Sequence, residues 1–294
     1  MPQKNSITIY TMSQKGYAVI QALCQKNILT ENDLIVVGRD KNVKDDFADT
    51  IIELCKKHQI KYEERKNHKE ASTDYHMAIA WRWMLPTTDK LIILHDSLLP
   101  KYRGFLPLVS ALMNKDTTIG VTALYANDYY DSGDIIAQSK TDISYPMKIQ
   151  KLINIIEKNY QELAVNILRK IKNSDVLKAT PQNHEEATYS LWRDEEDYRI
   201  DWSQNAKDIQ RFIHAVGVPY SGASTILNGQ LVRIEDAELF PDKKIVNRNP
   251  GKVIFIENKR PVVVCGKGLL KITVIKDENG QSILPLKSFR ARFK

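Results

Sequence analysis

Up to about residue 190, the chain alternates short apolar runs with longer stretches whose apolar residues recur at helical spacing. The apolar runs predict buried strands at residues 7–10, 34–37, 77–81, 91–95 and 121–125. The periodic stretches predict helices at residues 17–28, 47–58 and 149–171. This order is typical of an α/β fold with a Rossmann-like, mostly parallel sheet and helices on both faces. Such sheets bind ligands beyond the carboxyl ends of their strands, so residues that follow a strand are the first functional candidates.

The pattern changes in the last third of the chain. One helix is predicted at residues 202–216, and five β-like runs follow at residues 223–227, 231–234, 253–256, 262–265 and 269–275. Asn228-Gly229, between the first two runs, is typical of a hairpin turn. These features predict a small, OB-like C-terminal β-barrel, and we place the domains at residues 1–188 and 189–294.

The composition is that of a globular protein. Of the 294 residues, 43% are hydrophobic and 27% are charged, and no apolar run approaches the roughly 20 residues that a membrane span needs. Cys24, Cys55 and Cys265 are widely spaced and form no disulfide framework. The N-terminus has no apolar leader-like run, so these features predict a cytoplasmic protein without a membrane partner.

Positive charge is concentrated at the C-terminal end. The net charge is +7, and residues 241–294 hold thirteen Lys or Arg against four Asp or Glu. This excess favours an anionic partner such as a nucleic acid or a nucleotide, although a solvated lysine-rich surface has the same composition. The sequence has no GxGxxG after its first strand, no P-loop and no cluster at zinc-binding spacing, so we predict no metal ion.

The apolar run at residues 91–95 ends in His95, and a stiff cationic loop follows it. That loop, SLLPKYRG, contains Lys101 and Arg103. A lone histidine at a strand end is more often structural than catalytic, but the loop beside it favours a site. Further along, Asp131-Ser132-Gly133-Asp134 places a carboxylate on a sharp turn, a pattern that a simple turn also explains.

Three motifs taken together resemble the formyltransferase family that uses a formylated tetrahydrofolate. They are the stretch from His95 to Gly104 with Pro107 after it, Ile119-Gly120-Val121-Thr122, and Asp131-Ser132-Gly133-Asp134-Ile135-Ile136. Later stretches resemble the family's barrel domain and the helix that leads into it, namely IDW (200–202), RFIHAVGVPYSGA (211–223) and NGQLVRI (228–234). The resemblance covers nearly the whole chain.

The resemblance implies that a primary amine attacks the formyl carbon on N10 of N10-formyltetrahydrofolate. Because the tetrahedral intermediate carries negative charge on oxygen, the site needs a proton acceptor for the amine, a donor to the oxyanion and a proton for N10. His95 is implied as the proton shuttle, and Asp131 as the carboxylate that orients its ring. No covalent intermediate is implied.

The family's pterin lies between the loop upstream of the histidine and the loop that carries the aspartate. The matching residues, which we predict to bind the cofactor, are Trp81, Arg82, Trp83, Met84, Leu85, Ser132, Gly133 and Asp134. Two tryptophans in three residues suit a flat aromatic ligand, and core packing explains them equally well. The predicted substrate contacts are Ser97, Lys101 and Arg103, with both cations as candidates for a diphosphate.

One position departs from the family. An asparagine that polarises the formyl oxygen usually stands two residues before the histidine, where this chain has Ile93. Loss of one oxyanion donor costs roughly 3–4 kcal/mol in another enzyme class. Three interpretations stay open: a different donor (protonated His95, a backbone N–H or water), a protein that only binds, or related chemistry such as hydrolysis of the formyl donor. The presence of both His95 and Asp131 favours the first.

The acceptor is inferred from what the chain lacks. Members that formylate initiator tRNA resemble one another in a long basic insertion after the second strand, where this chain has only the short, mixed-charge stretch 39–46. The chain is also too long for the small purine-pathway member. The resemblance therefore favours a UDP- or dTDP-linked amino-deoxy sugar used for surface polysaccharides, speaks against tRNA, and leaves a homodimer open. The alternatives are a methionyl-tRNA formyltransferase and a non-catalytic folate- or nucleotide-binding protein.

Overall fold

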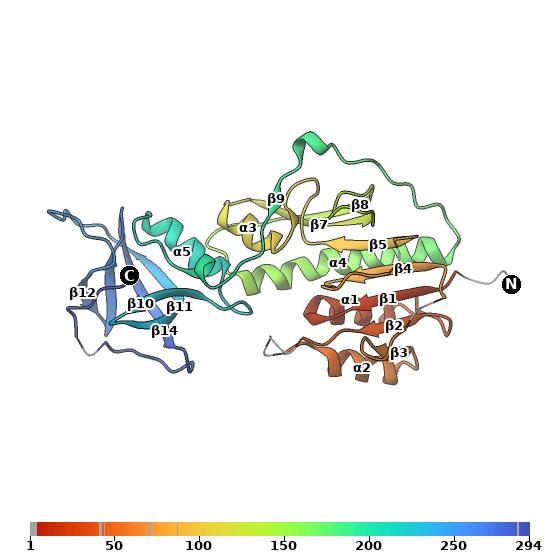
Figure 1. The fold of residues 1–294 in the computed structure, drawn as a ribbon, viewed down its shortest axis with the longest axis horizontal. Coiled ribbons are helices and arrows are strands. Elements are labelled where there is room, and N and C mark those ends of the chain that lie inside the picture. The colour runs from red at the N-terminus through yellow and green to blue at the C-terminus, as the bar shows by residue number, and fades with distance from the viewer. Residues whose placement is uncertain (1–4, 41–42, 44, 70–71, 87, 287) are drawn as a thin grey trace. The chain divides into compact units, whose positions relative to one another are not determined.

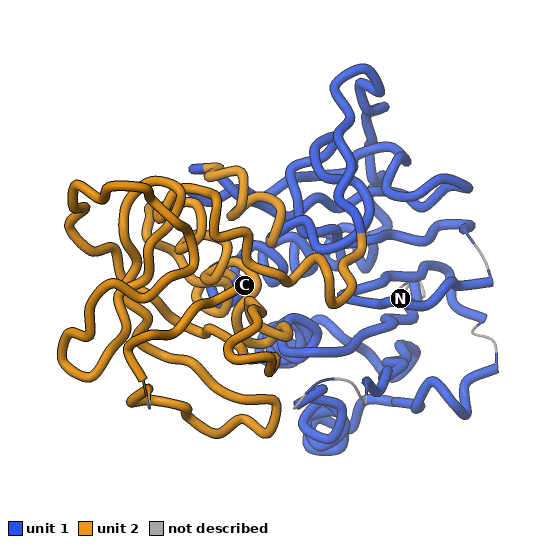
Figure 2. Tube along the Cα trace, turned by 60° about the vertical axis from the view of Figure 1, so that its left-hand side comes forward, with its two compact units in different colours: residues 1–108, 117–143, 153–191 blue, residues 109–116, 144–152, 192–294 orange. Residues whose placement is uncertain are grey.

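The computed structural model describes residues 5–40, 43, 45–69, 72–86, 88–286 and 288–294. The chain forms two compact units (Figure 2). Unit 1 comprises residues 1–108, 117–143 and 153–191, and unit 2 comprises residues 109–116, 144–152 and 192–294. Two short segments from the first 188 residues thus belong to unit 2, because long-range packing, which local patterns do not encode, decides the unit of each segment.

Unit 1 is built on a seven-stranded sheet in the order β3-β2-β1-β4-β5-β7-β8 (Figure 1). Its strands are β1 (Ile7–Thr11), β2 (Leu34–Val37), β3 (Lys61–Glu64), β4 (Tyr75–Ile79), β5 (Leu91–His95), β7 (Thr118–Tyr125) and β8 (Ile135–Asp142). The first five strands of the order are parallel, whereas β7 runs antiparallel to both β5 and β8. The predicted α/β class with a mostly parallel sheet is confirmed.

Long helices cover one face of this sheet. Helices α1 (Ser13–Gln25) and α2 (Ala48–Lys57) contact each other, and α4 (Ile149–Lys172) joins α1 through a hydrogen bond of 3.1 Å from Gln161 to the carbonyl of Ala18. The sequence predicts helices on both faces. The opposite face receives no crossover helix from the described part of the β3–β4 connection, because the ten residues between these strands are too few to form one.

Unit 2 contains a five-stranded antiparallel sheet in the order β10-β11-β14-β13-β12. Its strands are β10 (Ala223–Leu227), β11 (Gln230–Phe240), β12 (Val253–Glu257), β13 (Arg260–Val264) and β14 (Leu269–Asp277). Ile226 of β10 exchanges two backbone hydrogen bonds of 2.9 Å with Lys294, and Val253 of β12 donates to Ala291 at 3.0 Å. Residues 291–294 therefore join the two edge strands, so the sheet closes into the predicted barrel.

The remaining elements are short. They are α3 (Pro107–Met113), α5 (Ala206–Ala215), two 3₁₀ turns (His184–Glu186 and Glu196–Tyr198) and a two-stranded parallel pair, β6 (Arg103–Gly104) with β9 (Tyr189–Ser190). Helix α5 begins after Asn205, whose side chain accepts a hydrogen bond from the N–H of Asp208 at 3.0 Å. Within the described ranges, no helix is both long and apolar enough to cross a membrane.

Candidate active site

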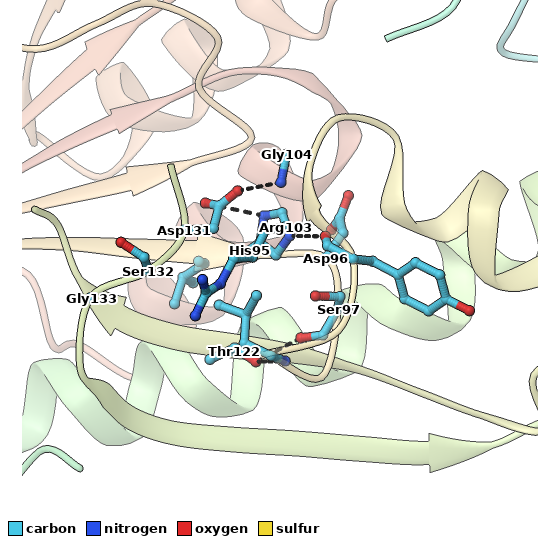
Figure 3. Close-up of polar contacts among 12 residues, drawn as sticks. His95, Asp96, Ser97, Arg103, Gly104, Thr122, Asp131, Ser132 and Gly133 are labelled. Atoms are coloured by element: carbon cyan, nitrogen blue, oxygen red, sulfur yellow. Dashed lines mark hydrogen bonds and ion pairs between the residues drawn. The ribbon is translucent and has the colours of Figure 1, made fainter. Parts of the chain in front are cut away.

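Strand β5 places His95 at the carboxyl edge of the sheet. The register pairs Leu94 with Ile79, so β4 and β5 end side by side. The His95 side chain is 9% exposed, and its Nδ1 lies 3.5 Å from Oδ1 of Asp131 (Figure 3). The structure thus brings together the two residues predicted to be catalytic, which are 36 positions apart in sequence (131 − 95). Their catalytic roles stay a prediction.

Both ring nitrogens of His95 face oxygen acceptors. Nε2 lies 2.8 Å from the carbonyl oxygen of Tyr102, and a carbonyl can only accept, so Nε2 carries the hydrogen of that contact. With that hydrogen in place, Nδ1 can donate to Asp131 only when the ring is the doubly protonated cation. The arrangement is therefore suited to holding a proton between the imidazole and the carboxylate.

The turn that carries Asp131 is tightly held. Asp131 has a left-handed φ of 51°, which aspartate tolerates better than most residues. Its Oδ2 accepts a hydrogen bond of 2.8 Å from the backbone N–H of Gly104 (Figure 3). A Cβ at Gly133 would lie 1.8 Å from the carbonyl oxygen of Tyr125, so a side chain there requires the backbone to move. These contacts fix where the carboxylate points.

Hydrogen bonds within the loop after His95 hold its shape. The Ser97 hydroxyl donates to the carbonyl of Lys101 at 2.6 Å. The Thr122 hydroxyl donates to the carbonyl of Ser97 at 2.6 Å and accepts from the N–H of Leu99 at 3.0 Å. The hydroxyl hydrogen of Ser97 is thus used inside the loop, and its predicted substrate contact stays a prediction.

The two cations of this loop differ in exposure. Lys101 is exposed, whereas Arg103 is only 2% exposed. The Arg103 guanidinium donates to Gln182 at 2.7 Å and also contacts His184 and Tyr189. The described contacts of the buried Arg103 guanidinium are all with protein groups, and its predicted diphosphate contact stays a prediction. A cationic sequence motif does not show which of its side chains turns inward.

Trp81 and Trp83 contact protein groups at the ends of β1 and β2. The Trp81 ring centroid lies 5.4 Å from that of Tyr10 and 4.9 Å from that of Trp83. A Cβ at Gly38 would lie 2.6 Å from the Trp83 ring, and the guanidinium of Arg65 lies 4.2 Å from the centroid of that ring. The packing interpretation accounts for these contacts, and the pterin contact stays a prediction.

The other predicted cofactor residues differ in exposure. Arg82 is exposed and pairs with Asp40, Met84 is 83% exposed, and Leu85 is half-buried. In the aspartate turn, the buried Ser132 hydroxyl donates to the Asn127 side chain at 3.0 Å, Gly133 is buried and Asp134 is exposed. Their contacts with a folate stay predictions.

Ile93 lies on the same face of β5 as His95, because side chains alternate along a strand. It is half-buried, and its neighbours across the sheet are Ala78 and Leu124. That row of the sheet is apolar on all three strands. A hydrogen-bond donor in place of the family's asparagine therefore has to come from outside this row.

Two exposed aromatic rings stand next to the Gly104–Asp131 hydrogen bond. Phe105 is 51% exposed and Tyr130 is 68% exposed, and their ring centroids lie 6.3 Å apart. They follow Gly104 and precede Asp131 directly in sequence. Exposed rings beside a buried histidine and carboxylate make an apolar rim that suits a flat ligand.

Comparison with known proteins places two family models along the chain. The Formyl transferase family model matches residues 31–168, and the model for the Formyl transferase C-terminal domain matches residues 193–293. The chain belongs to the formyl transferase family.

Similar proteins differ in their acceptors. A methionyl-tRNA formyltransferase of Ralstonia nicotianae is 30% identical over 198 residues, 67% of this chain and 60% of the relative's length. The chain thus spans about three fifths of that curated relative. A similar fold is found in WlaRD, a sugar 3N-formyl transferase solved with dTDP and 5-N-formyl-THF (TM-score 0.68, 17% identity, 95% of this chain and 100% of that one). Another is the N-formyltransferase from Helicobacter canadensis, in complex with folinic acid and dTDP-3-aminofucose (TM-score 0.68, 16% identity, 95% and 100%).

Two polar groups of this formyl transferase family member escaped the sequence prediction. Asp96, next to His95, pairs with Lys15 of α1 and accepts a hydrogen bond of 2.5 Å from the hydroxyl of Tyr160 in α4. Gln182 contacts both Arg103 and the aspartate turn. The partners of these residues lie far away in sequence, so no local pattern shows the contacts. Among the described residues, no group of three or more His, Cys, Asp or Glu is placed to hold a metal ion.

Proposed function

We propose that this protein transfers the formyl group of N10-formyltetrahydrofolate to the primary amine of a UDP- or dTDP-linked amino-deoxy sugar, in the cytoplasm, for surface polysaccharide biosynthesis. The amine nitrogen bonds to the formyl carbon, and the bond from that carbon to N10 breaks. The amine loses one proton and N10 gains one, so the reaction needs no net acid or base. A group that first accepts and then returns a proton therefore suits it.

The observation that carries this proposal is the His95–Asp131 pair. Its nitrogen and oxygen lie 3.5 Å apart, and the carboxylate is also held by the N–H of Gly104. In the proposed reaction the imidazole moves the proton, and Asp131 stabilises the ring while it is charged. Neither role needs a covalent intermediate or a metal ion.

A donor to the oxyanion has to replace the family's asparagine. Ile93 and its neighbours Ala78 and Leu124 offer no polar side chain. We assign this role to the Nδ1–H of protonated His95, because its contact with Asp131 is long at 3.5 Å and can be exchanged for the oxyanion, whereas Nε2–H stays bound to the carbonyl of Tyr102.

The surroundings of the pair support a nucleotide-linked acceptor. Lys101 presents a positive charge to solvent from the loop that follows His95, which suits a diphosphate. The exposed rings of Phe105 and Tyr130 offer a face on which a nucleobase can stack. The two sugar-modifying proteins of similar fold were solved with dTDP or a dTDP-linked amino sugar.

Methionyl-tRNA is the second candidate acceptor. The 30% identical relative from Ralstonia nicotianae is a methionyl-tRNA formyltransferase, and residues 241–294 carry an excess of nine positive charges (13 − 4). A tRNA-binding enzyme neutralises many phosphates, so its affinity falls steeply as salt concentration rises. A nucleotide sugar, with two phosphates, produces a much weaker salt dependence.

A panel assay separates these candidates. The protein is incubated with N10-formyltetrahydrofolate and, in turn, UDP-, dTDP- and GDP-linked 3- and 4-amino sugars or methionyl-tRNA, and tetrahydrofolate release is followed. We expect turnover with at least one UDP- or dTDP-linked amino sugar. Turnover with methionyl-tRNA alone would replace the sugar proposal, and folate binding without any turnover would identify a binding protein.

A further inference from the structure

The segment that joins the two predicted domains lies along the candidate site. Thr180 exchanges two backbone hydrogen bonds with Ile135, at 2.8 and 2.9 Å. Strand β9 (Tyr189–Ser190) pairs with β6 (Arg103–Gly104), and the N–H of Arg103 donates to the carbonyl of Thr188 at 2.8 Å. Residues 180–190 thus contact both the strand that follows the aspartate turn and the loop that follows His95.

Gln182 is the buried side chain through which this segment contacts the aspartate turn. It is 6% exposed, and its Nε2 donates to the carbonyl of Asp131 at 2.8 Å and to that of Gly133 at 2.7 Å. Its Oε1 accepts from Nε of Arg103 at 3.2 Å and from Nη2 at 2.7 Å. One amide therefore uses both of its donor hydrogens on the turn and its oxygen on the guanidinium.

Arg103 strengthens this contact. Its guanidinium is buried, and among the described residues no carboxylate lies within 4.0 Å of it, so the amide oxygen of Gln182 is its closest partner. A positive charge on the oxygen side of an amide polarises the amide, which makes its N–H groups better donors. Gly104, the next residue after Arg103, donates its backbone N–H to the Asp131 carboxylate at 2.8 Å.

We propose that Gln182, polarised by Arg103, is the positioning residue that sets the direction of the Asp131 carboxylate toward His95. The proposal rests on the formyl transfer proposed above and adds a residue to it. Asp131 holds a left-handed φ of 51°, a conformation that needs support from its surroundings. Without the amide, the carbonyls of Asp131 and Gly133 lose their buried donors, and the turn rotates to find others.

Two substitutions of Gln182 test this role. Gln182→Met keeps the length of the side chain and removes every hydrogen bond. Gln182→Glu keeps the acceptor for Arg103 but places a carboxylate against the two carbonyls of the turn. Because a misplacement of about 1 Å costs on the order of 10²-fold in rate, we expect kcat to fall at least about tenfold in both variants. The KM for each substrate and the Kd for the formyl donor should stay within about threefold, since Gln182 is buried and its amide is used on protein groups.

Asn183→Ala is the matched control in the same segment. The Asn183 side chain is exposed, and its described contacts stay within the short 3₁₀ turn: it accepts from the N–H of Glu185 at 3.2 Å and donates to the Glu186 carboxylate at 2.9 Å. We expect its kcat to equal that of the wild type within about twofold. Such a result would show that loosening this segment in general does not cause the fall in kcat expected for the Gln182 variants.

A double-mutant cycle shows whether Gln182 acts through Asp131. In an Asp131→Asn background, Gln182→Met should lower kcat less than about twofold further. Independent effects of the two substitutions, an unchanged kcat in both Gln182 variants, or loss of the folded state in both would overturn the proposal.

Amide hydrogen exchange gives a readout that needs no turnover. Exchange of the amides at residues 131–134 and 104 should accelerate in Gln182→Met but not in Asn183→Ala, whereas exchange in β1 and β4 should stay slow. If no acceptor supports turnover, the proposed function fails and this measurement still decides the positioning role. Unchanged exchange in the turn would overturn the positioning role alone.

Discussion

Two buried histidines of this protein each face an aspartate, one in each unit. His95 of unit 1 lies 3.5 Å from Asp131, and His214 of unit 2 lies 3.0 Å from Asp236. Their side chains are 9% and 6% exposed. Distance and burial therefore do not separate the candidate catalytic pair from the other pair, and the second pair is even the closer one.

The difference lies in what else binds the carboxylate. Lys148 lies 2.6 Å from Asp236, so the charge of that aspartate is balanced inside unit 2. Burial raises the pKa of Asp236, but the contacts with Lys148 and His214 outweigh it and lower the pKa overall. Burial lowers the pKa of His214, against the attraction of Asp236. This pair is suited to a neutral ring and a permanently charged carboxylate, which is a structural arrangement.

The Asp131 carboxylate, in contrast, is held by a peptide N–H and by no described lysine or arginine. It sits on a turn with a left-handed backbone, beside the exposed rings of Phe105 and Tyr130. An aspartate that has a histidine, but no lysine or arginine among the described residues, beside its carboxylate is suited to proton transfer. The distance between a histidine and an aspartate thus does not by itself indicate a catalytic pair. The other groups that bind the carboxylate, Lys148 at Asp236 and the Gly104 N–H at Asp131, separate the two cases.

Removing each histidine in turn gives the largest expected contrast. His95→Ala should lower kcat by about 10²- to 10⁴-fold, the usual contribution of a general acid or base. His214→Gln should leave kcat within about threefold, because its ring lies in unit 2 against Asp236 and has no part in the proposed chemistry. The panel assay with the best acceptor measures both. A His95→Ala variant within threefold of the wild type would remove this histidine from the mechanism.

The fixed aspartate turn is the second point of contrast. Gly133→Ala places a methyl group 1.8 Å from the carbonyl of Tyr125, so the turn has to shift, and we expect a loss of about 10²-fold in kcat. The control is Gly229→Ala in the barrel hairpin, where φ is positive (82°) and no atom lies within 4 Å of the new Cβ. It should cost about 1 kcal/mol of stability and leave kcat unchanged. Equal kinetics of the two variants would contradict a rigid turn.

The sequence predicted the elements that bury apolar residues and the motifs that lie next to them. The runs at β1, β2 and β5 and the stretches at α1, α2 and α4 stand out because their apolar residues follow the period of the element. Strand β3 was missed, since its sequence KYEE is polar and its residues are exposed or half-buried at the sheet edge. Strand β4 runs from Tyr75 to Ile79 and so begins and ends two residues earlier than predicted. Trp81 therefore lies in the loop that follows the strand.

The site was predictable only where its residues stand in contiguous motifs. His95 and Asp131 belong to such motifs, whereas Gln182 reaches the site from 51 residues beyond Asp131 in an unremarkable polar stretch. The direction of a side chain was equally hidden, since Lys101 and Arg103 belong to one loop but only Arg103 is buried. Contacts of this kind depend on how distant segments pack, and residue types along the chain do not encode that locally.

The pH dependence of folding should reveal the pair in unit 2. The pKa of His214 lies below its ordinary value of 6.5, because burial disfavours the charged ring. The unfolded chain therefore binds the proton first as pH falls. The stability that neutral His214 contributes is complete above pH 6.5 and is lost as pH falls from there through the folded pKa.

Urea unfolding between pH 8 and pH 5 measures this loss, and His214→Gln should flatten the profile. His76 in unit 1 also has a pKa lowered by burial, so its contribution has the same sign. His76→Gln is therefore the control that should retain the part due to His214. A profile that keeps its slope in His214→Gln would show that this ring does not titrate with folding.

The smallest expected effect concerns the position where this chain departs from its family. Ile93→Asn restores an amide two residues before His95, on the same face of β5. If protonated His95 already supplies the donor to the oxyanion, the new amide adds little, and kcat should change by less than about threefold. A matched Ile93→Val variant reports the effect of altered packing alone. A rise in kcat of tenfold or more in Ile93→Asn only would show that the donor is missing in the wild type and that protonated His95 does not supply it.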